Sequence, residues 1–246
     1  MAELLELRQI NKHFGGLQVL RGIDLTITTG ERRAIIGPNG AGKTTLFNLI
    51  SGELQPSSGQ VLLGGKDVTG KAPNQMCALG LARTFQKNNL FFQLTTYENV
   101  RLAVQAHEGC AQRWFRPWQS FGSVNNHTRN VLVRLDLWDR RDDIVKNLSY
   151  GEQRQLEVAI ALAAEPKILL LDEPTAGMSP AETARTIEML AALPRELTLL
   201  IIEHDMDAVF SLADRIAVLN YGEVLADGPP DAVKSNPKVQ EVYLGV

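Results

Sequence analysis

The chain has 246 residues, of which 44% are hydrophobic and 22% charged, and its formal net charge is −3. This is the size and composition of one globular domain or one domain with an insertion, and the charge excludes the basic footprint of a nucleic-acid-binding protein. Two cysteines, Cys77 and Cys110, are too few for a disulfide framework or a zinc site, so we expect a protein of the reduced cytoplasm. No apolar run approaches the roughly 20 residues of a membrane span, and we expect no signal peptide at the N-terminus.

The first 95 residues predict mainly short strands separated by turns. Ile23, Leu25 and Ile27 alternate with polar residues, as on a half-buried strand. An apolar strand at 33–36 runs into a glycine-rich loop that a helix follows. Further strands are expected at 60–63 and, within a stretch of loop and turn, around 82–86.

Residues 96–147 have a different character, which predicts a mostly helical insertion. Helical spacing of apolar residues runs over 96–106 and again over 130–137, on either side of a segment rich in glycine, arginine and aromatic residues. From Ser149 onward helices and strands alternate, with a helix to about 164, a strand at 167–171, a helix at 180–193, a strand at 198–202, a helix at 205–212, strands at 215–219 and 223–227, and short helices over 230–244. This alternation predicts an α/β fold with a largely parallel sheet.

The glycine-rich loop is the strongest single motif. It fits the pattern G-x-x-x-x-G-K-[ST] and lies between a buried strand and a helix, the context in which such a loop wraps a phosphate chain. We expect the Lys43 ammonium to reach the β- and γ-phosphates of a nucleoside triphosphate and the Thr44 hydroxyl to hold Mg²⁺. The pattern and its context together disfavour a plain glycine turn. The loop consists of Gly37, Pro38, Asn39, Gly40, Ala41, Gly42, Lys43, Thr44 and Thr45.

Two acidic residues end the strand predicted at 167–171. Asp172 and Glu173 come directly after four apolar residues, which places them at the carboxyl edge of a parallel sheet, where such sheets bind ligands. Asp172 is expected to support Mg²⁺ through water, and Glu173 to polarise the water that attacks the γ-phosphate. The alternative interpretation is that both acids are simply solvated at a strand end. The phosphate loop upstream favours the magnesium and general-base roles over this alternative.

A second anion site is predicted at the start of the helix after the insertion. Ser149 can cap this helix, while Gly151 is expected to leave backbone N–H groups open. Taken alone, the segment is better interpreted as an ordinary capped helix, because such helices are common.

Five ordered features together resemble the ATP-binding subunits of ABC transporters over essentially the whole chain. They are the phosphate loop with Lys43, a glutamine at Gln86, the signature segment at Ser149-Tyr150-Gly151, Asp172-Glu173 after an apolar strand, and a histidine at His204. The resemblance implies a P-loop NTPase core with an antiparallel β subdomain and an inserted α-helical subdomain. It assigns residues 1–95 and 165–246 to the core with its β subdomain, and 96–164 to the helical subdomain.

The resemblance also implies individual roles. Gln86 looks like a contact to Mg²⁺ that relays to a membrane partner, and His204 looks like a switch on the γ-phosphate. Phe14 looks like the aromatic that stacks on adenine, with Val19 beside it. Since stacking tolerates any base, the preference for ATP comes from the resemblance.

In the resembled family the signature segment binds the ATP held by another subunit. The resemblance therefore implies a head-to-tail dimer with an identical or paralogous subunit and two ATP molecules at the interface, contacted by Ser149, Tyr150, Gly151 and Glu152. Tyr150 and Glu152 depart from the usual glycine and glutamine, and Ser179 stands where an aspartate is usual. Glu152 would be unfavourable near a phosphate unless it points at backbone N–H groups.

Several short motifs are similar to those of importers of branched-chain amino acids and related amides. They are Tyr-Gly at 150–151, Ala-Gly-Met at 176–178, Phe-Gly-Gly at 14–16, Ala-Arg-Thr-Phe-Gln at 82–86 and the tail at 236–245. The expected partners are integral membrane permeases and, indirectly, a periplasmic solute-binding protein, which would hold this chain on the cytoplasmic face of the inner membrane. The ATPase of the lipopolysaccharide export machine and a non-transport ABC ATPase, such as an iron–sulfur assembly factor, are the alternatives. We also expect the aromatic segment 113–121 and residues 85–92 to dock a helix of the permease.

Overall fold

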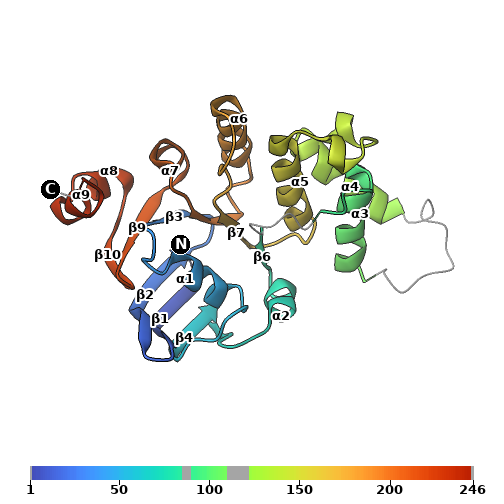
Figure 1. The fold of residues 1–246 in the computed structure, drawn as a ribbon. Helices are drawn as coiled ribbons and strands as arrows, with labels where there is room; N and C mark the ends of the chain where they lie inside the picture. The colour runs from blue at the N-terminus through green and yellow to red at the C-terminus, as the bar shows by residue number, and fades with distance from the viewer. Residues whose placement is uncertain (1, 85–89, 110–121, 245–246) are drawn as a thin grey trace.

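The computed structural model describes residues 2–84, 90–109 and 122–244, and its architecture is a sheet of mainly parallel strands with a second, antiparallel sheet (Figure 1). The larger sheet has six strands in the order β10-β9-β3-β8-β7-β6. All neighbours are parallel except β9 and β10, which form a hairpin. The strands are β3 (Arg32–Ile36), β6 (Leu81–Arg83), β7 (Ile168–Asp172), β8 (Thr198–Ile202), β9 (Arg215–Asn220) and β10 (Glu223–Gly228).

The neighbouring strands β7 and β8 each carry a run of four apolar residues, because the two faces of each strand contribute to different cores. Leu169 and Leu171 of β7 pack in one cluster with the helices of the insertion. Leu170, between them, packs on the opposite face in a cluster that includes α1 and the antiparallel sheet. A strand covered on both sides loses the polar alternation of a half-exposed strand, which is why the sequence reads as an unbroken apolar run.

The antiparallel sheet has the order β2-β1-β4-β5. Its strands are β1 (Glu3–Phe14), β2 (Leu17–Thr28), β4 (Ser58–Leu63) and β5 (Lys66–Asp67). The expectation of short strands at the start of the chain was wrong, because β1 and β2 each run for 12 residues. Register shifts between Leu7 and Ile10, where Gln9 has φ 49°, interrupt the apolar alternation that a regular strand would show.

Three helices of the insertion lie together at one side of the molecule in Figure 1, away from the C-terminal helices. They are α3 (Thr96–His107), α4 (Gly122–Arg134) and α5 (Tyr150–Leu162), with short 3₁₀ turns η3 (Trp138–Arg140) and η4 (Val145–Asn147) between α4 and α5. The prediction of a helix over 130–137 placed its start too late, because α4 already begins at Gly122. Its buried positions, Val124, Thr128, Val131 and Leu132, follow helical spacing from the first turn onward.

The remaining helices lie beside the sheets. They are α1 (Lys43–Ile50), α2 (Pro73–Ala78), α6 (Pro180–Ala191), α7 (Met206–Leu212), α8 (Pro230–Lys234) and α9 (Pro237–Leu244). Among the described residues no helix is both long and apolar enough to cross a membrane.

Candidate functional site

The glycine-rich loop connects β3 to α1 at the carboxyl edge of the parallel sheet. Gly37 has φ 154°, and a Cβ atom there would lie 2.2 Å from the Leu219 carbonyl oxygen. Gly42 has φ 103°, and its Cβ would lie 2.7 Å from Leu20 Cδ2. The loop therefore requires glycine at both ends, because the backbone of β9 and the core residues of β2 press against it.

The crest of the loop is exposed and its end leaves a helix terminus open. Asn39 and Gly40 are exposed, and the Ala41 N–H donates to the Pro38 oxygen at 3.2 Å. Among the described residues no side chain caps α1 at its N-cap, Gly42. The first N–H groups of α1 are thus available to an anion, which the positive end of the helix also favours.

Lys43 is buried beneath this loop. Its Nζ donates to the oxygens of Gly37 and Pro38, at 2.7 and 3.0 Å. Burial lowers the pKa of Lys43, while the negative charges of Glu173 and Asp172 nearby offset part of that effect. The structure therefore brings together the three charged residues that the sequence assigned to the phosphate site. The next two residues, Thr44 and Thr45, are exposed and half-buried, respectively.

Glu173 and His204 meet just beyond the carboxyl ends of the adjacent strands β7 and β8. His204 Nε2 lies 3.0 Å from Glu173 Oε1, and both side chains are partly exposed. The Glu173 N–H donates to the Ile202 oxygen at 2.9 Å, and Glu173 has φ 48°, a left-handed conformation that is uncommon for a residue other than glycine. Such strain persists where the surrounding structure enforces it, and it is concentrated at functional sites.

The loop after Glu173 is fixed by a buried carboxylate. Glu203 accepts hydrogen bonds from the N–H of Thr175, at 3.2 Å, and from the Thr175 hydroxyl. Its other oxygen accepts the His204 N–H at 2.9 Å. Glu203 therefore locks the two segments that carry Glu173 and His204 against each other.

Arg83 is a residue of this site that sequence reasoning missed. Its Nη2 lies 2.9 Å from Oδ2 of Asp172, and both side chains are buried. Its Nη1 donates to Asn48 Oδ1 at 2.6 Å and to Ser51 Oγ at 3.1 Å, at the end of α1. The available signal was an arginine within the strand expected around 82–86, because an arginine that a strand buries needs polar or acidic partners.

The predicted anion site at α5 is a capped helix start. Ser149 Oγ accepts the Glu152 N–H at 3.2 Å, and Glu152 Oε2 accepts the Ser149 N–H at 2.8 Å. The Arg140 Nε lies 3.1 Å from Glu152 Oε1. Glu152 therefore points at a backbone N–H, the arrangement in which its charge is favourable. The expectation of an open N–H at Gly151 was wrong, because this group donates to Glu182 Oε1 at 3.3 Å.

Phe14 ends β1 and Val19 lies on β2, in the hairpin whose second strand contacts the phosphate loop. The Phe14 ring is 46% exposed, and Lys12 Nζ lies 5.1 Å from its centre. The Val19 oxygen lies 3.2 Å from where a Cβ of Gly42 would be. An exposed aromatic ring on the hairpin that contacts the phosphate loop is suited to stacking on a base.

Residues 20–176 of the chain match the family described as "ABC transporter", and residues 223–246 match "Branched-chain amino acid ATP-binding cassette transporter". The chain belongs to the ABC transporter ATP-binding family. ATP hydrolysis is the activity of this family, so the chain is an ABC ATPase.

Curated relatives are similar to this chain over nearly its whole length. The chain is 38% identical to the high-affinity branched-chain amino acid transport ATP-binding protein LivG of Escherichia coli over 98% of each chain. It is 37% identical to BraF of Pseudomonas aeruginosa, which carries the same description, over 98% of each chain. A probable LivG of Archaeoglobus fulgidus is 34% identical over 99% of this chain and 96% of its own.

Solved ABC cassettes share the fold. A nucleotide-free ATP-binding cassette of an ABC transporter superimposes with a TM-score of 0.85 at 30% identity, covering 99% of this chain and 100% of its own. A cassette in its ADP conformation has a TM-score of 0.86 at 31% identity, with 100% of each chain covered. The fold class predicted from the sequence is thereby confirmed.

The oxygen atoms of side chains near Lys43 are suitable ligands for Mg²⁺ in this ABC ATPase. Mg²⁺ prefers oxygen ligands and retains several waters beside substrate phosphates, so it needs few protein groups. The Thr44 hydroxyl is exposed at the start of α1, and Asp172 Oδ2 accepts from Arg83. Gln86, the other predicted ligand, lies outside the described residues, as does the segment 113–121 expected to dock a partner.

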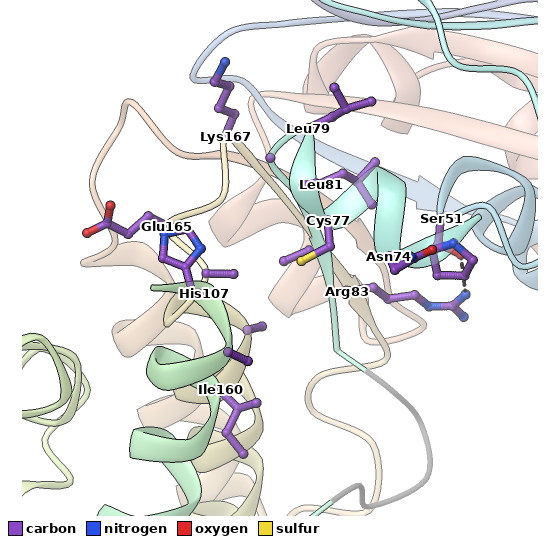
Figure 2. Close-up of a pocket in the computed structure, with 18 of the residues that line it drawn as sticks. Ser51, Asn74, Cys77, Leu79, Leu81, Arg83, His107, Ile160, Glu165 and Lys167 are labelled. Carbon is purple, nitrogen blue, oxygen red and sulfur yellow. Dashed lines mark hydrogen bonds between the residues drawn. The ribbon is translucent and has the colours of Figure 1, made fainter. Parts of the chain in front are cut away.

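A groove separates the helical insertion from the ABC core (Figure 2). It has a volume of about 670 Å³, and its walls come from α2, β6, α3 and α5. Small apolar side chains dominate its lining, while His107, Glu165 and Lys167 supply polar groups. Arg83 also lines it, so one side chain contacts both this groove and Asp172.

Proposed function

We propose that this chain is the ATP-hydrolysing subunit of an ABC importer that takes up branched-chain amino acids or related amino acids and amides. The observation that carries the proposal is similarity over nearly the whole length to ATP-binding proteins described in those terms. The match of residues 223–246 to a branched-chain amino acid family adds support at the tail. The alternatives, lipopolysaccharide export and iron–sulfur assembly, have no comparable support in these relatives.

In this proposal the glycine loop and Lys43 hold the phosphates. Lys43 Nζ, which now donates to two loop oxygens, transfers its hydrogen bonds to phosphate oxygens, and the open start of α1 supplies N–H groups. Thr44 and Asp172, with Gln86, would hold Mg²⁺, which supplies positive charge to the transferred phosphoryl group. Phe14 stacks on adenine beside Val19.

Glu173 acts as the general base in this proposal. Its carboxylate lies at the carboxyl edge of the sheet, where it interacts electrostatically with Lys43. It accepts a proton from the attacking water. His204, 3.0 Å from Glu173, orients that carboxylate and contacts the γ-phosphate. Glu173 directly follows β7 and His204 lies two residues beyond β8, and because these strands are paired, the sheet places both side chains at the same edge.

The proposed assembly has two ATP-binding subunits and two permease subunits. We propose that residues 96–164 act as the helical subdomain, whose signature residues Ser149 to Glu152 contact the partner's ATP. The groove of Figure 2 is the proposed receptor for a permease helix, because it lies between the α2–β6 segment and helices α3 and α5 and its lining is largely apolar. This would place the chain on the cytoplasmic face of the membrane, with a solute-binding protein on the other side.

Uptake in the host tests both the substrate and the base. We expect loss of the gene to abolish uptake of radiolabelled leucine, isoleucine or valine, and the wild-type gene to restore it. Glu173→Gln should fail to restore uptake, whereas Glu188→Gln, the same change at an exposed position of α6, should restore it. Unchanged uptake in the deletion strain would refute the substrate, and restoration by Glu173→Gln would refute the role of Glu173.

A further inference from the structure

The starts of two helices face each other at the signature segment. The N–H of Gly151, in the first turn of α5, donates to Oε1 of Glu182, in the first turn of α6. A Cβ at residue 151 would lie 3.2 Å from that oxygen and 3.3 Å from Glu182 Cγ. A carboxylate therefore occupies the end of α5 at which an anion is most favourable, and it belongs to the same chain.

The two oxygens of Glu182 have separate tasks. Oε2 accepts the N–H and the hydroxyl of Ser179, at 3.0 and 2.7 Å, and so completes the cap of its own helix. Oε1 accepts the N–H of Gly151. These hydrogen bonds, from Ser179 first and Gly151 next, lower the pKa of Glu182, so the group is an anion at neutral pH.

Tyr150 makes a second tie between the same two segments. A Cβ on Gly177, in the loop that follows Glu173, would lie 3.6 Å from Tyr150 Cε1. The Tyr150 hydroxyl accepts from Arg154 Nη2 at 2.8 Å, which holds the ring over that loop. Tyr150 and Ser179, two departures from the usual family pattern, thus both take part in joining α5 to the segment between β7 and α6.

We propose that Glu182 is a positioning residue that competes with the partner subunit's nucleotide for the N–H of Gly151. This inference rests on the proposed function, in which the signature segment binds ATP across a dimer. While Glu182 holds Gly151, that N–H is closed to a phosphate. When the dimer closes, the carboxylate must release it, since a phosphate and a carboxylate repel each other at one donor.

The division between the two oxygens makes this release local. Oε1 can leave Gly151 while Oε2 keeps both hydrogen bonds to Ser179, so α6 remains capped. The cost of dimer closure then includes the loss of one charge-assisted hydrogen bond and the repulsion between Glu182 and the incoming phosphate. A neutral side chain at residue 182 would remove most of that cost.

The test is ATP-driven dimerisation of the purified full chain carrying Glu173→Gln, with Mg²⁺ and ATP titrated and the mass followed by light scattering. Adding Glu182→Gln keeps a capping residue at this position but removes the charge. We expect half-maximal dimer formation at an ATP concentration at least about threefold lower, because a charged competitor is gone. A weakened fold would not tighten a dimer, so a merely structural role predicts no such gain.

The matched control is Glu98→Gln, which makes the same change in the capping box of Thr95 at the start of α3. It should leave the ATP dependence unchanged. Equal ATP dependence for the Glu182 and Glu98 variants, with a normally dimerising parent, would overturn the role of Glu182 alone. A parent that stays monomeric at saturating ATP, or dimerises equally well with Ser149→Ala, would overturn the proposed cross-subunit site and this inference with it.

Discussion

Gly37, Gly42 and Lys43 show how strictly single positions are constrained here. A Cβ atom on Gly37 would clash with the backbone of Leu219, and one on Gly42 would clash with the side chain of Leu20. Lys43 is buried with its charge directed at two carbonyl oxygens of the loop. Neutral oxygens only partly replace the solvation of an ammonium group, so this arrangement favours the arrival of phosphate.

Lys43→Ala should therefore weaken ATP binding by at least about tenfold, because charge-assisted contacts to phosphate are among the strong ones. Lys66→Ala, at an exposed position on β5, is the control and should bind ATP normally. Titration calorimetry of both variants measures the difference. Equal affinities would contradict the assignment of the phosphate loop.

Glu152 and Glu182 show where residue-level reasoning succeeded and where it failed. A glutamate three residues after a serine predicts a capping box, and Ser149 with Glu152 forms one. Ser179 and Glu182 have the same spacing and the same local structure. Only the fold reveals that Glu182 has an oxygen left over for Gly151, because the two residues lie 31 positions apart.

At the scale of elements, Arg83 ties β6, β7 and α1 into one unit. Its guanidinium contacts Asp172 at the end of β7, and Asn48 and Ser51 near the end of α1. The strand β6 is only three residues long, so its position at the sheet edge depends on this side chain as well as on the ladder. The sequence predicted strands around 82–86 and at 167–171, but neither their pairing nor this anchor.

Arg83→Met should destabilise the chain by about 3 kcal/mol, because removing one partner of a buried ion pair leaves the carboxylate of Asp172 buried without its arginine. Arg195→Met, at an ion pair with Asp214 that is largely exposed, should cost less than about 1 kcal/mol. Urea unfolding followed by circular dichroism compares the two. Similar losses for both variants would show that the Arg83 pair is not a structural anchor.

At the scale of the whole molecule, the helical insertion and the core share a cluster yet leave a groove between them. Residues of α3, α4 and α5 pack with Leu169, Leu171 and Leu199 of the parallel sheet. The groove of Figure 2 opens beside this shared cluster, with Arg83 in its lining. A partner bound there would lie one side chain away from Asp172, which offers a physical route from permease to nucleotide.

Ala106→Trp tests the groove. Ala106 lies in its lining on α3 and is exposed, so a large side chain there should fill the groove without disturbing the core. We expect loss of co-purification with the permease and unchanged ATP binding, whereas Ala232→Trp, at an exposed position of α8, should preserve both. Normal assembly of the Ala106 variant would refute the groove as the docking site.

The sequence by itself determined the features that depend on local order. These are the glycine loop between strand and helix, the acidic pair that ends β7, the capped start of α5 and the alternation that predicts a parallel sheet, because each follows from spacing within a few residues. Tertiary structure alone decided which distant groups meet: Glu173 with His204, Arg83 with Asp172, and Glu182 with Gly151. Such contacts depend on strand order and on how helices pack, and short-range patterns carry no information about either.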